Sequence, residues 1–388
     1  MRKLTKSKIS IVELFFIAAV LFIFTGLVQK QKTAYKNFHP GKVWLDTSGK
    51  VINAHGGGFI YYDGTYYWFG EHKIAGPAGN RAMVGVHVYS SKDLYNWTDR
   101  GIALHVSNDP NSEIIKGCVI ERPKVVYNKK TGKFVMWFHL ELKGQGYSAA
   151  RAAMATADKV TGPYTYLRSY RPNAYKWPIN ATAKDTTPAT GGDSTLRKLP
   201  GVEKAKAGYY LRRDYPKGQM ARDMTVFKDG DKAYLIYASE ENYTMNIAEL
   251  SDDYTSFTGK WCRLLIGGHN EAPAMFKYKD KYYLITSGCT GWAPNAARSA
   301  IATSIWGPWK KLGNPCVGPD SALTFHSQST YVLKVHGKKN AFIFIADRWH
   351  PQNPIDGRYI WLPIQFGNSS KIVLKWRDEW NLNFFDKN

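Results

Sequence analysis

A β-hairpin pattern recurs along the chain and constrains its fold more than any other feature. Each copy has an apolar arm, a short polar turn and an aromatic return arm, as in FIYYDGTYYWFGE at 59–71. The copies lie at 55–71, 121–139, 222–239, 271–287 and 327–347. A second strand pair follows each of the first four hairpins, so one unit supplies four strands in roughly 45–55 residues, as in propeller blades. The sequence therefore predicts an all-β fold, a five-bladed β-propeller over residues 36–388, without helical periodicity.

One stretch breaks this rhythm. Residues 169–208 are rich in Pro, Gly, Thr and Lys, which favours a long loop between two blades. Loops of this length within a compact domain usually have a function. We expect this loop to cover one face of the propeller and to form a wall of a substrate pocket.

The N-terminal residues 1–35 have the pattern of a targeting segment. Four basic residues within the first eight precede the apolar run LFFIAAVLFIFTGLV at 14–28. This run suits a signal peptide, and an extended run over 9–28 would suit a retained membrane anchor. Both interpretations predict that the rest of the chain is exported to the periplasm, the cell surface or the medium.

Net charge and cysteine spacing limit the classes of partner. The formal net charge is +22, but the basic residues are scattered and match no nucleic-acid-binding motif. Nucleic acid is therefore not an expected partner, whereas attraction to an acidic polysaccharide stays open. The four cysteines form no CxxC pair, so a zinc site is not expected. No cofactor and no catalytic metal are predicted.

Each hairpin begins with a polar residue at a similar distance from its turn. In a propeller the first strand of each blade lines the central channel, so these side chains should converge at one end of the channel. Converging carboxylates are costly, because like charges repel and burial disfavours ionisation. Such sets persist mainly where a function requires them. The residues are His55, Glu121, Asp223, Glu271 and Gln328.

Two carboxyl groups across a pocket are the groups that cleave a glycosidic bond. One is protonated and donates to the leaving oxygen, while the other assists a water molecule or stabilises charge. Sugar sites also use aromatic side chains, and Trp292 and Trp349 each follow the second strand of a blade. Arg222 neighbours Asp223 and should face the opposite side of its strand.

The chain resembles glycoside hydrolase family 43, and within it the branch of exo-acting galactan 1,3-β-galactosidases. The resemblance spans about residues 43–380 and depends on AHGGGFIYYDGTYYWFGE, ERPKVVYN, ARDMTVFKDGDKAYLIYAS, EAPAMFK, TGWAPN and SQSTYV. It implies an inverting hydrolase of plant-type galactan or arabinogalactan chains. By the same resemblance, Glu271 is the general acid, Asp223 tunes the pKa of Glu271, and Gln328 holds the attacking water.

The resemblance also assigns sugar recognition and leaves one role open. It implies that Glu121 binds the terminal sugar, and we expect Glu71, Trp292, Asn295 and Trp349 to contact that sugar as well. The first blade has His55 and glycines where the family ordinarily has an aspartate base. A neutral amide is a poor base, so Glu121, Glu71 and His55 stay alternatives to Gln328 as the group that activates the water. In an inverting enzyme, the base is expected to lie about 6.5–9.5 Å from the acid, Glu271. His55 is otherwise expected to contact the sugar.

Three functions remain compatible with these residues. The leading one removes β-1,3-linked galactose, and a second is an α-L-arabinofuranosidase or β-galactofuranosidase of the same fold. The third is a carbohydrate-binding propeller without catalysis, which the absent first-blade aspartate suggests.

Overall fold

The computed structural model describes residues 34–387, of which Tyr35 onward form one compact unit. The predicted signal peptide or anchor at 1–35 lies almost wholly outside the described residues. Among the residues described, no helix is both long and apolar enough to cross a membrane.

The described chain contains six β-sheets, so the predicted number of five blades is wrong. The all-β propeller fold itself is confirmed. Four sheets have four antiparallel strands each, and two sheets have three strands. The four-stranded sheets are β1 (His55–Tyr62), β2 (Thr65–Glu71), β3 (Gly85–Ser91) and β4 (Thr98–His105); β5 (Val119–Asn128), β6 (Lys133–Glu141), β7 (Arg151–Ala157) and β8 (Thr165–Tyr170); β9 (Met224–Asp229), β10 (Lys232–Ser239), β11 (Thr244–Leu250) and β12 (Phe257–Leu264); and β13 (Asn270–Tyr278), β14 (Lys281–Gly288), β15 (Arg298–Ala302) and β16 (Lys310–Gly313).

The two smaller sheets differ in their place in the fold. One consists of β18 (Gln328–Lys334), β19 (Phe342–Arg348) and β20 (Arg358–Pro363). The other combines β17 (Cys316–Val317), β22 (Ile372–Lys375) and β21 (Gln365–Phe366), with a parallel pair between β17 and β22. This last sheet contacts β20 through β22 and was not foreseen, because its strands are two to four residues long.

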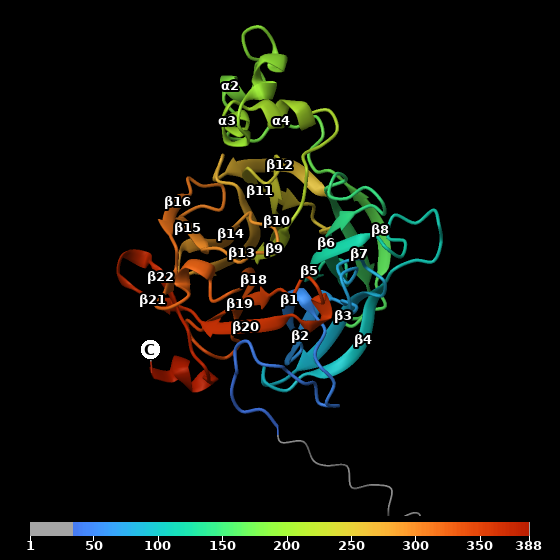
Figure 1. Ribbon diagram of the computed structural model, residues 1–388, viewed down its shortest axis with the longest axis vertical. Helices are drawn as coiled ribbons and strands as arrows, with labels where there is room; N and C mark the ends of the chain where they lie inside the picture. The colour runs from blue at the N-terminus through green and yellow to red at the C-terminus, as the bar shows by residue number, and fades with distance from the viewer. Residues whose placement is uncertain (1–33, 388) are drawn as a thin grey trace, which may run out of the picture. The chain divides into compact units, whose positions relative to one another are not determined.

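Five innermost strands form a closed ring around the centre of the fold (Figure 1). In ring order, β1 contacts β5, β5 contacts β9, β9 contacts β13, β13 contacts β18, and β18 contacts β1. Each of these strands belongs to one predicted hairpin, and each begins within two residues of a predicted polar residue. The ring therefore brings the polar residues of the five hairpins to one end of the channel.

Apolar side chains fill the space between each pair of neighbouring sheets. Five separate clusters occur, one in each gap of the ring. A sheet in this position is covered on both faces, which explains why all seven residues of β3 are buried. Trp68, Trp97 and Trp361, at most 1% exposed, close the gap between the first and last sheets of the ring.

The segment 169–208 is not the loop that the sequence predicts. It begins with the end of β8 and continues into short helices, which lie beyond β12 in Figure 1. None of its residues lines the cavity described below, so the expectation of a pocket wall is not met. The helices are α2 (Ala183–Thr186), η1 (Asp193–Lys198), α3 (Gly201–Lys206) and, just after the segment, α4 (Tyr209–Asp214); the other 3-10 helices are η2 (Ser321–Leu323), η3 (Pro354–Asp356), η4 (Asn368–Ser370) and η5 (Leu382–Lys387).

Arg263 of β12 joins these helices to the propeller. Its guanidinium bonds Asp185 of α2 (2.6 Å), the carbonyl of Ala205 in α3 (2.9 Å) and Glu240 (2.6 Å). The Arg263 side chain is 2% exposed and that of Glu240 is 0% exposed. Without a nearby positive charge, the ionised Glu240 would be an uncompensated buried charge.

Replacing Arg263 by Met is therefore expected to lower the free energy of unfolding by about 3–5 kcal/mol, because one member of a buried ion pair is removed. Urea unfolding followed by tryptophan fluorescence measures this loss. Lys311→Met, at an exposed position without an ion pair, is the matched control and should change stability by less than about 0.5 kcal/mol. A loss of under about 1 kcal/mol for Arg263→Met would contradict this account of how the helices are attached.

Candidate active site

β-Bulges follow the polar residues near the start of three inner strands. The pairing register shifts after His55 in β1, after Glu121 in β5 and after Glu271 in β13. The residue after each of them has a left-handed backbone, with φ between +55° and +58° (Gly56, Arg122 and Ala272). Bulges re-aim side chains, and strained backbone of this kind concentrates at functional sites.

A cavity of about 240 Å³ opens at this end of the ring. Seven of the nine predicted site residues line it: Glu271, Asp223, Gln328, Glu121, Glu71, Trp292 and Trp349. The remaining two, His55 and Asn295, do not. The cavity is also lined by residues that were not predicted, namely Asn80, Arg122, His139, Tyr147, Arg222, Asn242 and Gly291.

Glu271 has the properties of a proton donor. Burial raises the pKa of its carboxyl to about 7, the negative charge of Asp223 acts in the same direction, and Arg122 opposes both. Oε1 accepts a hydrogen bond from Gln328 Nε2 at 2.8 Å, and Asn242 Nδ2 lies 3.4 Å from Oε2. A carboxyl group with such a pKa is partly protonated near neutral pH and can act as a general acid.

Asp223 is held beside Glu271 by the backbone and by a buried cation. Its Oδ2 accepts from the Ala272 N–H at 3.1 Å and pairs with Arg122 at 2.9 Å. The charge of Asp223 thus lies next to the strand position that carries Glu271. This arrangement agrees with the predicted role of Asp223 in keeping Glu271 protonated.

Asp223→Asn is expected to shift the alkaline limb of the pH profile of kcat/KM downward by about one pH unit. The raised pKa of Glu271 means that activity falls as pH rises through about 7, because the acid loses its proton. Without the charge of Asp223 and with Arg122 retained, this loss begins at lower pH. A profile from pH 4 to 9 measures the shift, and an unmoved or raised alkaline limb would contradict the role of Asp223.

Gln328 contacts Glu271 directly, which the sequence did not indicate. Its Nε2 donates to Glu271 at 2.8 Å and to Ser287 Oγ at 3.0 Å. Its Oε1 accepts from Arg122 at 2.6 Å and from Trp349 Nε1 at 2.9 Å. All four hydrogen-bonding positions of the amide are therefore used, and a water molecule can bind the amide when one of these bonds opens.

Arg122 connects the groups of this site and was missed by the sequence analysis. Its guanidinium bonds Asp223, Gln328 and the carbonyl of Ser329, while its backbone N–H donates to Glu71 at 2.9 Å. The side chain is 5% exposed. Alternation along a strand would turn it away from Glu121, but the bulge brings both into the cavity.

Glu121 is held ionised by a buried histidine. Burial alone would raise the pKa of Glu121, but the hydrogen bond and charge of His139 hold it well below its usual range. Tyr147 (2.6 Å) and Asn80 (3.1 Å) donate to its other oxygen. The carboxylate therefore has three neighbouring donors, an environment that suits the binding of sugar hydroxyls better than proton abstraction.

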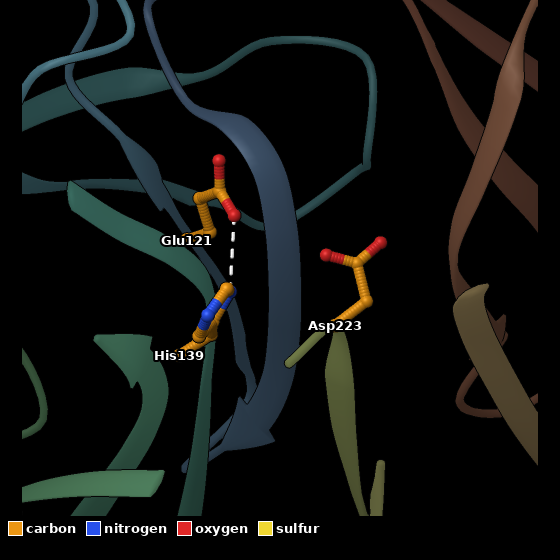
Figure 2. A group of neighbouring side chains, drawn as sticks. All are labelled: Glu121, His139 and Asp223. Atoms are coloured by element: carbon orange, nitrogen blue, oxygen red, sulfur yellow. Dashed lines mark hydrogen bonds and ion pairs between the residues drawn. The ribbon is translucent and has the colours of Figure 1, made fainter. Parts of the chain in front are cut away.

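Glu121, His139 and Asp223 lie close enough to suggest a metal site, with one ligand atom of each within 4.8 Å of the others. Figure 2 shows His139 below Glu121, joined by a hydrogen bond, with Asp223 across from them just before β9. Burial alone would lower the pKa of His139, but Glu121 on one ring nitrogen and Glu141 on the other raise it to about 9. A protonated imidazole has no lone pair for a metal ion. Glu121 and His139 therefore form a buried ion pair while Asp223 pairs with Arg122, so the three residues do not make a fitting metal site.

Glu71 and two tryptophans complete the wall of the cavity. The Glu71 carboxylate pairs with Lys73 at 2.5 Å and is 4% exposed. It fits only because residue 56 is glycine, since a Cβ there would lie 2.0 Å from Glu71 Oε1. The rings of Trp292 and Trp349 meet edge to face with centroids 5.4 Å apart, and Trp292 is 39% exposed.

His55 is not a sugar contact or a base in this structure, which corrects the prediction for it. Its side chain is 0% exposed, and burial lowers its pKa to about 3. The ring stacks on Tyr359 behind the cavity wall, 3.9 Å from the buried Asp347. His55 therefore belongs to the packing beneath the site.

Asn295 likewise supports the site without lining the cavity. Its amide accepts from the Gly288 N–H at 2.7 Å and donates to the Gly288 carbonyl and to Thr290 Oγ1. These bonds close the loop that presents Trp292. Asn295 thus shapes this loop, and its contact with the sugar stays a prediction.

Comparison with known proteins identifies the family. A GH43 β-1,3-galactosidase solved with galactodeoxynojirimycin is 52% identical, with a TM-score of 0.85 over 89% of this chain and 100% of that one. The chain belongs to glycoside hydrolase family 43. The model of the glycosyl hydrolases family 43 matches residues 204–358, which include Asp223, Glu271 and Gln328.

Two further family 43 enzymes share the fold. An exo-β-1,3-galactanase from Clostridium thermocellum is 35% identical, with a TM-score of 0.71 over 88% of this chain and 66% of that one. An exo-β-1,3-galactanase from Phanerochaete chrysosporium, solved with galactose, is 31% identical. Its TM-score is 0.70 over 89% of this chain and 68% of that one. No curated protein matches the chain. The resemblance inferred from the sequence motifs is confirmed.

Proposed function

We propose that this family 43 glycosidase is an inverting, exo-acting enzyme that removes β-1,3-linked galactose from galactan or arabinogalactan side chains. The observation that supports it most is Glu271, a carboxyl group with a pKa raised to about 7 in a cavity that also holds the ionised Glu121. The three solved proteins reported above are named as a β-1,3-galactosidase or exo-β-1,3-galactanases.

In the proposed reaction, Glu271 protonates the oxygen of the leaving sugar. Gln328 donates to Oε1 of Glu271, so we assign the reactive proton to Oε2. Asp223 keeps this proton in place near neutral pH. Arg122 and Trp349 fix the Gln328 amide, and substrate binding releases one of these bonds so that the amide can orient the attacking water. The water bonds to the anomeric carbon as the bond to the leaving oxygen breaks, and the proton that the water loses passes to solvent.

The size of the cavity supports exo action. At about 240 Å³ it falls below the usual 300–1,000 Å³ of ligand pockets, and one terminal sugar suits it better than an internal chain segment. Glu121, Glu71, Trp292 and Trp349 would contact that sugar. Ionised carboxylates accept hydrogen bonds from hydroxyl groups, and the exposed Trp292 ring offers an apolar face.

Substrate panels distinguish the proposal from its alternatives. Linear β-1,3-galactan should yield galactose as the sole early product, whereas aryl α-L-arabinofuranoside and aryl β-D-galactofuranoside should be hydrolysed at least about 100-fold more slowly. Faster release of arabinose or galactofuranose would transfer the assignment to the alternative glycosidases. Binding of galactan without any release would indicate a carbohydrate-binding protein.

We also infer that the protein is exported, from the basic and apolar pattern of residues 1–35. If the N-terminal segment is retained after export, residues 9–28 would attach the protein to the membrane. Fractionation of cells that produce the full chain, with N-terminal sequencing of the product, tests it. Recovery of the uncleaved chain in the cytosol would contradict it.

A further inference from the structure

The opposite end of the channel forms a second and larger hollow. It has a volume of about 890 Å³ and is formed by the far ends of the five inner strands and the turns that follow them. We call it the basal funnel and define it by residues 59–63, 125–129, 226–229, 275–279 and 331–342. Tyr278 lies seven positions after Glu271 along β13, so the funnel lies roughly 23 Å from Glu271.

The basal funnel is strongly basic. Seven lysines and two aspartates line it, whereas the catalytic cavity is lined by four carboxylates. Asp229 pairs with Lys277 at 2.9 Å, and Lys338 pairs with Asp386. Within residues 34–387, the other five lysines have no carboxylate at ion-pair distance: Lys129, Lys228, Lys279, Lys334 and Lys339.

These five lysines therefore present uncompensated positive charge around one concave surface. All except Lys228 are exposed. Burial lowers the pKa of Lys228, and the nearby charge of Lys129 lowers it further. A cluster of like charges that repel one another lowers its energy by binding an anion.

Aromatic rings alternate with the lysines on this surface. Tyr61, Tyr62, Tyr127 and Tyr278 line the funnel, and Tyr61 is 36% exposed. Lys279 Nζ lies 5.3 Å from the centre of the Tyr278 ring, so cationic and aromatic groups are adjacent. Tyrosine combines a flat apolar face with a hydroxyl group, which suits the face and the rim of a sugar ring.

We propose that the basal funnel binds an acidic polysaccharide, with uronate carboxylates on the lysines and sugar rings on the tyrosines. This site goes beyond the proposed hydrolysis and does not depend on it. It would hold a charged glycan on the enzyme while terminal sugars reach the other face, which raises their effective concentration.

Other polyanionic partners fit the funnel less well. No arginine is among the lining residues of the funnel in the described chain, although arginine is favoured where phosphates are bound through two hydrogen bonds. A second copy of the chain would bring one set of unpaired lysines against another.

The test compares two charge-reversed variants of the full-length protein that lose equal charge. One carries Lys129→Glu, Lys279→Glu, Lys334→Glu and Lys339→Glu in the funnel. The control carries Lys184→Glu, Lys198→Glu, Lys310→Glu and Lys311→Glu, at exposed positions without ion pairs outside it. The probes are polygalacturonate, neutral β-1,3-galactan and single-stranded DNA, measured by affinity electrophoresis and calorimetry.

The funnel variant should bind polygalacturonate at least about tenfold more weakly, while the control stays within about twofold of the unmodified protein. Hydrolysis of a small galactoside should be unchanged in both, which separates this result from a failure of the proposed function. Equal loss in the two variants, absence of binding by the unmodified protein, or DNA binding as tight as that of polygalacturonate would each overturn the proposal.

Tyr61→Ala tests the aromatic part without changing charge. It should weaken polygalacturonate binding severalfold while leaving its salt dependence as it is, because stacking and not ion pairing is lost. Unchanged affinity would overturn the assignment of sugar stacking to this surface.

Discussion

Glu271→Gln is expected to lower kcat on β-1,3-galactan by about 10³-fold, since the isosteric amide keeps the shape of the site but cannot donate the proton. The size of the loss should depend on the leaving group. An aryl galactoside with an acidic phenol departs without protonation, so its hydrolysis should fall by less than about tenfold. Steady-state kinetics on the two substrates measure the difference.

Glu249→Gln is the matched control for this substitution. Glu249 belongs to β11, outside the cavity, and pairs with Lys232 at 3.2 Å. It should leave both activities unchanged. An equal loss on both substrates for Glu271→Gln would show that Glu271 contributes binding or folding and not proton donation.

Gln328→Ala is expected to lower kcat by about 10²–10³-fold, because Glu271 loses its 2.8 Å contact and the attacking water loses its support. Gln328→Glu should be nearly as impaired and should shift the pH profile. A carboxylate at this position can still accept from Arg122 and Trp349, but it brings a like charge against Glu271. The pKa of Glu271 then rises, and the alkaline limb moves to higher pH.

The two shifts have opposite signs, which makes them a sharp test. Asp223→Asn removes a negative charge from the neighbourhood of Glu271, and Gln328→Glu adds one. A Gln328→Glu profile with an unmoved or lowered alkaline limb would contradict the contact between Gln328 and the acid. Gln365→Glu in β21, distant from the catalytic cavity, controls for added charge.

The sequence predicted the site better than it predicted the architecture around it. The hairpin pattern identified every strand of the ring and the polar residue near the start of each strand. The short helices of 183–214 were missed because four to six residues are too few to show a helical period. The sixth sheet was missed for the same reason, since its strands are shorter than one hairpin arm.

The missed site residues have a common physical cause. Alternation predicts that Arg122 and Arg222 face away from their acidic neighbours, yet both line the cavity. A bulge re-aims Arg122, and Arg222 lies before β9 begins, where strand alternation does not apply. Neither deviation has a signal in a single sequence. The burial of His55 depends on Tyr359, which is some 300 residues away along the chain.

The most direct test of the central claim follows the anomeric proton of the first galactose released from β-1,3-galactobiose by proton NMR. An inverting enzyme with Glu271 as its acid should release α-galactose first, with the β anomer appearing later by mutarotation. Release of β-galactose first would contradict the inverting reaction proposed for this site, and no release of galactose would contradict the proposed activity itself.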